Sequence, residues 1–348
     1  MDLEGYAFNV VWDYEGNIRQ FLLRFYPFQE AVEMVDVLKR KVFVKRTKIP
    51  GVQLAHLNVG STVSVLNRQL LVMSFADEIT RQAMEKLFQR TVVIFKVNLH
   101  MGSVLDSLTS GGLSNLMTVT RIKMLVLQKE EILKLGLVGQ CHFTAPSVCA
   151  EVTGQDAVKH CQDVLGAISS CFDIQDFCYA APDVSTADWT LRSIFDKPRA
   201  NTAICDGSGM LCLIKPHAIR EGSLPKIIKH ILNNDFVVTA IETVVMNRNS
   251  AESFLELYKG VVPEYLAWVD HMASGPSVAM EVRHLESGTY DKFRKLVGPT
   301  DPGIAKTIRP DTLRALFGRD KILSAVQCTD LERDCASDLE FMFNYIAK

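Results

Sequence analysis

The chain has 348 residues, which at roughly 150 residues per domain predicts two or three domains. Lys plus Arg number 38 and Asp plus Glu 40, a formal net charge of -2, and this balance excludes binding to nucleic-acid phosphates as the main function. No apolar run reaches the roughly 18 residues of a membrane span, and Asp2 and Glu4 stand where a secretory signal would be basic. We therefore expect an intracellular protein.

Residues 1–88 are expected to form a β-rich module with a helical connector at its end. Short alternating or apolar stretches, beginning at Tyr6–Trp12 and ending at Val63–Met73, are separated by turn residues such as Pro50 and Gly51. This spacing favours hairpins over helices. Residues 76–89 instead carry apolar side chains at helical spacing, which predicts the connector helix.

From about residue 90 a pattern of alternating strands and helices occurs twice. Residues 92–96 match residues 211–215, and residues 145–152 match residues 275–282. Such self-similarity indicates an internal duplication. From Lys96 to Pro146 there are 50 positions, whereas the matching interval in the second copy has 61. The first copy is therefore expected to be truncated, within a segment that should carry helices.

Three domains follow from this pattern: residues 1–88, a first repeat at 89–196 and a second repeat at 210–348. Residues 196–210 hold Gly, Ser and Pro with little periodic apolar content, as a linker would. In the second repeat the order β-α-β-α-β-α predicts a ferredoxin-like sheet with helices on one face. The expected fold class is mixed α/β (α+β), with a β-rich module followed by two ferredoxin-like domains, the first truncated.

The nine cysteines include no C-x-x-C pair, and the sequence has no histidine cluster at zinc-finger spacing. We therefore expect neither a structural metal nor disulfides. In a reducing compartment free cysteine is mostly a small buried side chain, so we interpret these residues as packing.

Four segments resemble nucleoside diphosphate kinases, in the order in which that family carries them: residues 213–218, 258–262, 274–281 and 296–302. The β-rich module, with its stretch Val42–Lys48, is similar to the DM-ten domain that precedes two kinase repeats in part of the family. The resemblance covers essentially the whole chain and is strongest in the second repeat. It implies kinase folds that, in active members, transfer a γ-phosphoryl group between nucleotides through a phosphohistidine.

The resemblance also implies a nucleotide-binding site in the second repeat. The positions that match the family's phosphate ligands are Lys215, Tyr258, Arg294, Thr300 and Arg314. Ammonium and guanidinium groups neutralise phosphate charge, and a hydroxyl can donate to a phosphoryl oxygen. The alternative is that the lysine ends a strand near solvent and the arginines lie on ordinary exposed helix faces. No cofactor is expected, although a vestigial nucleotide with magnesium remains open.

The nucleophilic histidine of the family is missing from both repeats. In the second repeat Gln327 stands at its position and Ser324 replaces an asparagine, and no histidine follows His284. A carboxamide nitrogen is delocalised into its carbonyl and cannot accept a phosphoryl group as a neutral imidazole can. In the first repeat we assign Ala180 to the histidine position. Cys328 is the one substitute nucleophile considered, and we interpret it as a packing residue because nothing electropositive is fixed beside it in the sequence.

Three functions are weighed. The preferred one is a non-catalytic structural protein, a pseudo-enzyme that keeps the folds without the chemistry. The alternatives are a nucleotide-binding regulator of microtubule nucleation or of the γ-tubulin ring complex, and a kinase with residual activity. The resemblance implies a location, because members with a DM-ten domain belong to cilia and flagella, where they line doublet microtubules as microtubule inner proteins.

The implied partners are therefore tubulin and other axonemal doublet proteins, and possible association with the γ-tubulin ring complex stays open. The implied locations are the cytoplasm, the cytoskeleton and the axoneme of a cilium or flagellum. Neither nucleic acid nor a membrane is expected as a partner. A basic stretch of six lysines and arginines between Lys39 and Lys48 fits this expectation, and Lys45, Arg46 and Lys48 are the candidate partner-binding residues. The alternative is that this stretch is a solvated hairpin rim.

Overall fold

The structure is a computed structural model that describes most of the chain. The described residues are 5–14, 17–49, 52, 54, 57, 59, 61–66, 68–96, 100–109, 117–137, 145–171 and 178–347. Pro50, Gly51 and Cys141, on which expectations above depend in part, lie outside them. Among the described residues, no helix combines the length and apolar character needed to cross a membrane.

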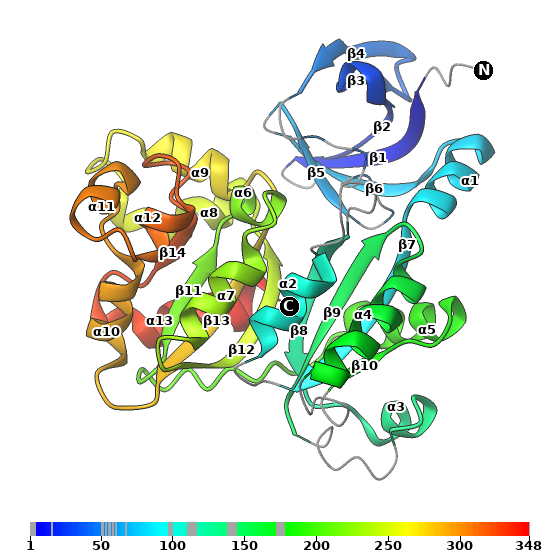
Figure 1. The fold of residues 1–348 in the computed structure, drawn as a ribbon. Helices are drawn as coiled ribbons and strands as arrows, with labels where there is room; N and C mark the ends of the chain where they lie inside the picture. The colour runs from blue at the N-terminus through cyan, green and yellow to red at the C-terminus, as the bar shows by residue number, and fades with distance from the viewer. Residues whose placement is uncertain are drawn as a thin grey trace.

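The fold is mixed α/β with a β-rich N-terminal region, which confirms the predicted class. Figure 1 shows the N-terminal sheet in blue above a larger sheet to which both repeats contribute. The N-terminal sheet is antiparallel, in the order β4-β3-β2-β1-β6-β5. Its strands are β1 (Tyr6–Tyr14), β2 (Asn17–Tyr26), β3 (Ala31–Asp36), β4 (Lys41–Lys48), β5 (Thr62–Val65) and β6 (Arg68–Phe75).

The alternating sequence of these strands explains the N-terminal core. In β2, Phe21, Leu23 and Phe25 face one side and are buried with Phe8 of β1, as period-2 alternation requires. The connector helix α1 (Glu78–Leu87) begins after Asp77, whose carboxylate accepts a hydrogen bond from the Thr80 amide at 2.6 Å. The predicted connector is therefore a capped helix.

The two repeats form a single eight-stranded sheet in the order β10-β7-β9-β8-β12-β13-β11-β14. The first repeat contributes β7 (Gln89–Lys96), β8 (Thr118–Leu125), β9 (Ser147–Gly154) and β10 (Cys178–Ala180). The second contributes β11 (Met210–Ile214), β12 (Phe236–Val245), β13 (Pro276–His284) and β14 (Val326–Cys328). Within each repeat the spatial order is fourth, first, third, second strand, the antiparallel arrangement of a ferredoxin-like fold.

The second repeat carries more helices than the first. The first repeat has α2 (Met101–Thr109), α3 (Lys129–Lys134), α4 (Ala157–Cys171) and α5 (Val184–Phe195) in its described residues. The second has α6 (Pro216–Arg220), α7 (Leu224–Leu232), α8 (Arg248–Phe254), α9 (Tyr265–Met272), α10 (Thr289–Val297), α11 (Pro302–Ile308), α12 (Leu313–Phe317) and α13 (Cys335–Glu340), followed by a π-helix at Phe341–Ile346. Shorter 3₁₀ helices lie at Pro27–Gln29, Glu256–Tyr258 and Glu332–Asp334.

Helices cover both faces of the large sheet, so the expectation of helices on one face was wrong. In β11, Cys212 and Ile214 pack with Ile227 of α7, whereas Leu211 and Leu213 pack on the opposite face with residues of α9 and α13. All five residues of β11 are therefore buried. A continuous apolar run such as Met210–Ile214 is typical of a strand covered on both faces.

The repeats join edge to edge where β8 meets β12, at the single residue pair Lys123 and Glu242. The ammonium of Lys123 donates to the Glu242 carboxylate at 2.6 Å, and both side chains are buried. Above them α2 crosses α7 so closely that a Cβ added to Gly102 would lie 2.5 Å from the backbone nitrogen of Lys229. One hydrophobic core then runs from α2 and α4 through α7 to α10, under both repeats.

The segment between the repeats is bonded to both of them. Arg199 donates to the buried Glu131 of the first repeat at 2.6 Å. Asn201 donates to the carbonyl of Phe343 at 2.8 Å, and Thr202 donates to the carbonyl of Thr239 at 2.7 Å, both in the second repeat. This segment is thus an ordered strap across the joint rather than a loose tether.

Candidate functional site

The candidate nucleotide site of the second repeat lies where β11 and β14 pair at the edge of the sheet. Leu213 is opposite Gln327, and Lys215 follows the end of β11 as the N-cap residue of α6. The Lys215 side chain is buried and lies over the ring of Trp268 at 5.4 Å. Its ammonium donates to the Ser324 hydroxyl at 2.9 Å and to the Ile322 carbonyl at 3.3 Å. Burial, with the nearby Arg314, lowers the pKa of Lys215 to about 7.

Arg314 lies beside this lysine and is also buried. Its Nε donates to the Val326 carbonyl at 3.1 Å, and one terminal nitrogen donates to the Gly298 carbonyl at 3.1 Å and reaches the exposed Thr300 hydroxyl at 3.5 Å. Burial lowers the pKa of Arg314. Within the described residues neither Lys215 nor Arg314 forms an ion pair with a carboxylate, although the charge of the nearby Asp320 partly offsets the lowering of the Lys215 pKa.

On the other side of the site, three side chains contact Asp330. Its carboxylate accepts a hydrogen bond from the Tyr258 hydroxyl and pairs with the guanidinium of Arg294 at 2.7 Å. The Gln327 amide nitrogen donates to the Tyr258 hydroxyl at 2.7 Å and approaches the same carboxylate at 3.4 Å. Burial and the nearby Asp338 raise the pKa of Asp330 to about 6.

The structure therefore divides the five predicted ligands into two groups. Lys215, Thr300 and Arg314 lie on one side, and Tyr258 and Arg294 lie on the other, bound to Asp330. The alternative of a lysine near solvent and exposed arginines is wrong for Lys215 and Arg314, which are both 3% exposed. Arg294 keeps 37% of its side chain exposed.

The sequence analysis assigned no role to Asp330. Asp330 lies two residues beyond the end of β14 (Val326–Cys328), in a bend, so neither strand alternation nor a motif position pointed to it. The identity of its partners depends on α10 and on the 3₁₀ helix at Glu256–Tyr258, which sequence spacing does not align. A carboxylate among phosphate-binding side chains opposes the binding of a phosphate there by charge repulsion.

Gln327 and Cys328 are both buried within the pairing of β14 with β11. Cys328 lies opposite Cys212. Contrary to the expectation from sequence, an electropositive group does lie near Cys328, because a terminal nitrogen of Arg294 is 3.8 Å from its Sγ. The thiol is only 1% exposed, which supports its interpretation as a packing residue.

The strand register corrects the assignment made for the first repeat. Ile94 of β7 corresponds to Leu213 of β11, and it lies opposite Tyr179, as Leu213 lies opposite Gln327. Tyr179, not Ala180, is therefore the counterpart of Gln327. A three-residue strand offers no pattern from which its register could be read, so only the pairing with β7 resolves it. The conclusion that this position holds no histidine is unchanged.

The first repeat also lacks the segment that carries the arginines. Residues 285–325 connect β13 to β14 and hold α10, α11 and α12, whereas residues 155–177 connect β9 to β10, with α4 as their described helix. Lys96 ends β7 at the place that corresponds to Lys215 at the end of β11. Among the described residues of the first repeat, no arginine takes the place of Arg294 or Arg314.

The candidate partner-binding residues lie on β4, at the edge of the N-terminal sheet, and all three are exposed. The Arg46 guanidinium lies 3.5 Å from the centre of the Tyr26 ring, and Lys48 pairs with Glu30 at 2.6 Å. Lys45 forms no ion pair among the described residues. The stretch is thus an exposed edge strand, and two of its three candidate residues already contact other side chains.

The described part of the chain contains no group of three or more His, Cys, Asp or Glu residues placed to hold a metal ion. One buried pair of histidines lies next to the candidate site: His217 of α6 and His271 of α9, with 2.9 Å between Nδ1 and Nε2. Burial and the charge of Lys215 lower the pKa of His217 to about 4, and burial with His217 lowers that of His271 to about 2. This pair is neutral at physiological pH.

Comparison with known proteins gives the same family over the whole chain. The sequence model described as "Nucleoside diphosphate kinase" matches residues 209–346. Nucleoside diphosphate kinase homolog 7 of Mus musculus is 30% identical over 378 aligned positions, which cover 99% of this chain and 94% of that protein. The protein of the same name from Rattus norvegicus has the same identity and coverage.

Shorter relatives align with part of the chain. The nucleoside diphosphate kinase of Aquifex aeolicus (strain VF5) is 28% identical over 134 positions, 38% of this chain and 92% of that protein. An orthorhombic crystal structure of the Aquifex aeolicus enzyme matches with 27% identity and a TM-score of 0.37, over 39% of this chain and 94% of that one.

Proposed function

We propose that this chain, which belongs to the nucleoside diphosphate kinase family, is a non-catalytic structural protein of ciliary or flagellar doublet microtubules. The observation that carries the first half of the proposal is Gln327, a carboxamide on β14 where the resemblance expects the phosphate-accepting histidine. An amide nitrogen has no lone pair available to attack a phosphorus atom. Family membership alone would predict an enzyme, and Gln327 is the observation that supports the absence of catalysis.

The surroundings of Gln327 support the same conclusion. Asp330 pairs with Arg294 and accepts from Tyr258, so two of the five phosphate ligands are bound to a protein carboxylate. Phosphoryl transfer depends on positive groups that stabilise the charge of the transferred phosphate. A carboxylate at this place acts in the opposite direction.

The joint between the repeats supports the structural half of the proposal. One sheet and one core run through both repeats, and the strap at 199–202 bonds to each. One continuous sheet and core through both repeats suit a structural role. Tubulin and other axonemal doublet proteins are the proposed partners, the axoneme is the proposed location, and the exposed basic edge strand β4 suits the acidic surface of tubulin.

Two measurements test this proposal. The purified chain, incubated with radiolabelled ATP and a nucleoside diphosphate, should transfer phosphate at a rate at least about 1,000-fold below that of an active family member, because removal of a covalent nucleophile typically costs several orders of magnitude. A tagged chain should remain with salt-washed axonemes. Turnover comparable to an active member would contradict the absence of catalysis, and a tag found only in the soluble fraction would contradict the structural role.

A second candidate function rests on Lys215 and Arg314. Both cations are buried and neither pairs with a carboxylate in the described residues, so an anion such as a nucleotide phosphate would compensate their charge. This favours a nucleotide-binding regulator, for example of microtubule nucleation through the γ-tubulin ring complex. Saturable binding of ATP or GDP that Arg314→Gln weakens, without turnover, would select this function over a purely structural one. Turnover with the same dependence would instead select a kinase with residual activity.

A further inference from the structure

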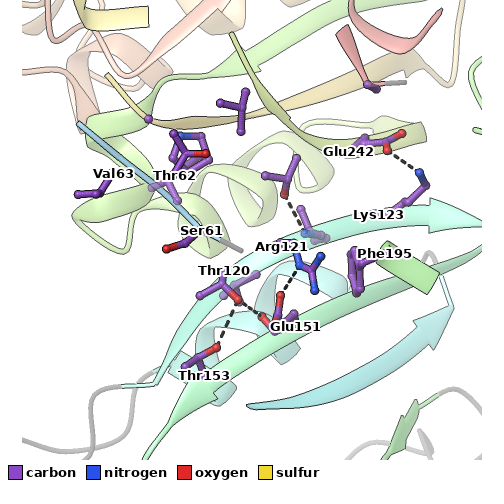
Figure 2. Close-up of a pocket in the computed structure, with 18 of the residues that line it drawn as sticks. Ser61, Thr62, Val63, Thr120, Arg121, Lys123, Glu151, Thr153, Phe195 and Glu242 are labelled. Carbon is purple, nitrogen blue, oxygen red and sulfur yellow. Dashed lines mark hydrogen bonds and ion pairs between the residues drawn. The ribbon is translucent and has the colours of Figure 1, made fainter. Parts of the chain in front are cut away.

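A large cavity lies where the three parts of the chain meet. Its volume is about 1750 Å³, and residues of the N-terminal module, of β8 and β9, and of β12 line it. Figure 2 shows Ser61, Thr62 and Val63 on one side, Thr120 and Arg121 on another, and the Lys123–Glu242 pair at its end. The volume exceeds the roughly 300–1,000 Å³ of typical small-molecule sites. It is also separate from the candidate nucleotide site, since Lys215, Gln327 and Asp330 do not line it.

Open sheet edges face this cavity. β5 is the last strand of the N-terminal sheet, so its outer edge has no strand neighbour in the described part of the chain. β8 pairs with β12 only at Lys123, and from Thr118 to Arg121 its one described strand neighbour is β9. The cavity is lined by residues 62–64 of β5 and by residues 118–123 of β8. An open edge offers backbone donors and acceptors to an extended chain.

The cavity is positively charged, although the whole chain is not. Seven lysine and arginine residues line it against three carboxylates, Glu151, Asp196 and Glu242, a net of +4 in a chain whose total is -2. Each of these carboxylates is already engaged: Glu151 pairs with Arg90 and Arg121, Asp196 with Arg121, and Glu242 with Lys123. Of the other lining cations, Lys48 pairs with Glu30 and Arg199 with Glu131, two carboxylates outside the lining. Lys197 and Arg220 therefore remain without a carboxylate partner among the described residues.

Arg220 is the clearest part of this excess. It ends α6, and one terminal nitrogen lies 3.4 Å from the hydroxyl and 3.5 Å from the carbonyl of Ser274, with no carboxylate partner among the described residues. Burial lowers its pKa. A half-buried guanidinium without an anion is costly, and an acidic group that entered the cavity would compensate it. Lys197, exposed on the strap, adds a second such charge.

We propose that this cavity binds an extended acidic peptide segment of a partner protein, which adds as a strand to the open edge of β5 or of β8 and places its carboxylates near Arg220 and Lys197. The apolar side chains of Phe195 and Val245, which line the cavity and are not fully buried, would contact alternate side chains of such a strand. The phosphates of a nucleic acid would also pair with the positive charge. A nucleic acid would nevertheless leave the open strand edges without backbone partners, and the cavity offers no row of aromatic side chains on which its bases could stack. The inference concerns a site and a partner beyond the proposed function, and it stands whether or not the chain is catalytic.

The test uses the full chain and a fluorescent peptide of about eight residues that alternates Glu and Val, the length of a long natural strand. Three matched probes accompany it: the same peptide with Lys for Glu, the same peptide with N-methylated backbone at alternate residues, and a short DNA duplex. Fluorescence anisotropy should show saturable binding of the acidic peptide. The Lys peptide, which carries the wrong charge, and the methylated peptide, which cannot complete the backbone hydrogen bonds, should each bind at least about tenfold more weakly.

Variants locate the binding. Arg220→Glu and Lys197→Glu should each raise the dissociation constant of the acidic peptide by about tenfold. The control is Arg309→Glu, the same change of charge at the exposed end of α11, which should change that constant less than twofold. Melting curves check that each variant is folded, and Lys197 is exposed, so its variant keeps the test valid if Arg220→Glu does not fold. Equal binding of the methylated peptide would refute strand addition, and unchanged binding in both variants would refute the site. If the DNA duplex binds more tightly than the peptide, and this binding depends on Arg220, the partner is a nucleic acid and not a peptide.

Discussion

The two repeats share one strand order and differ in what lies at the same edge of the sheet. The second repeat keeps the three helices between its third and fourth strands, and with them Arg294, Thr300 and Arg314. In the first repeat the corresponding connection is residues 155–177, against 285–325. Both repeats nevertheless keep four strands in the same order and contribute to one core.

This comparison indicates which contacts have been retained. Strand order, the α2–α7 crossing and the β8–β12 joint hold the body together, and they are present although neither repeat has a histidine at the nucleophile position. At the phosphate site the first repeat has Lys96 at the place of Lys215 but no counterpart of Arg294 or Arg314 among its described residues, whereas the second repeat has all three. Packing between the repeats thus holds the body of the protein together, whereas the two outer edges of the sheet, at β10 and at β14, differ between the repeats.

The largest expected difference between the repeats is chemical. Placing histidine in the second repeat, as Gln327→His with Ser324→Asn, should allow detectable labelling by the γ-phosphate of ATP, because Lys215 and Arg314 still supply positive charge. Tyr179→His in the first repeat should give at least about 1,000-fold less, since no arginine of the described residues lies there. Acid-labile phosphate on the protein is the measurement. Equal labelling of the two variants would show that the repeats do not differ as described.

The next largest effect concerns the joint. Lys123→Ala leaves the buried carboxylate of Glu242 without its partner and should destabilise the chain by about 3–5 kcal/mol. The double change Lys123→Met with Glu242→Leu removes both charges and should cost far less. Urea denaturation followed by circular dichroism measures both. If Lys123→Ala lowers the free energy of unfolding no more than the double change does, the pair does not hold the repeats together.

The helix crossing above the joint gives a smaller effect. Gly102→Ala places a Cβ against the backbone of α7, where no flexible side chain can move away, and should cost about 1–3 kcal/mol. Gly166→Ala in α4 is the matched control, because a Cβ there meets nothing within 4 Å. That change should be neutral or stabilising by up to about 1 kcal/mol, from helix propensity alone. The difference between the two melting temperatures reports the closeness of the repeats.

A pH effect separates the second repeat from the first. The pKa values of His217 and His271 lie near 4 and 2 in the folded chain, below the 6.5 of a free histidine. Between pH 6.5 and about 4 the unfolded chain therefore binds protons that the folded chain does not, so the free energy of unfolding should fall as pH falls, by up to about 1.4 kcal/mol per pH unit for each histidine.

The double variant His217→Gln and His271→Gln should flatten this part of the stability curve, because amides can replace the hydrogen bond without titrating. Chemical denaturation at a series of pH values provides the curves. An unchanged slope in the double variant would assign the acid sensitivity to other groups, and Asp330, whose folded pKa is raised to about 6, acts in the opposite direction.

The smallest effect on stability is expected outside both repeats, at the basic edge. Replacing Lys45, Arg46 and Lys48 by Ser should cost about 0–1 kcal/mol for each exposed charge. It should nevertheless lower the salt concentration that extracts the chain from axonemal doublets, because the attraction between exposed charges is screened over roughly 8 to 10 Å at physiological ionic strength. Lys306→Ser on the exposed face of α11 is the control. Extraction at the same salt as the parent would make this edge a solvated rim and leave attachment to the repeats.

Much of this protein could be derived from its sequence because the relevant features are local. Alternation in strands such as Phe21–Phe25, the match between residues 92–96 and 211–215, and the absence of any histidine after His284 are properties of neighbouring residues or of the composition of a segment. They gave the β-rich module, the duplication and the missing nucleophile. The phosphate ligands of the second repeat followed from motif positions, although their burial did not.

What only the tertiary structure decided depends on residues far apart in the chain. The pairing of Lys123 with Glu242 and the crossing of Gly102 over Lys229 join segments more than 100 residues apart, and no periodicity in either segment specifies the other. The register that makes Tyr179 the counterpart of Gln327 comes from the pairing of a three-residue strand with β7. The position of Asp330 between Arg294 and Tyr258, and the positive cavity between the three parts, arise in the same way, because packing free energy selects among contacts that local sequence leaves equally possible.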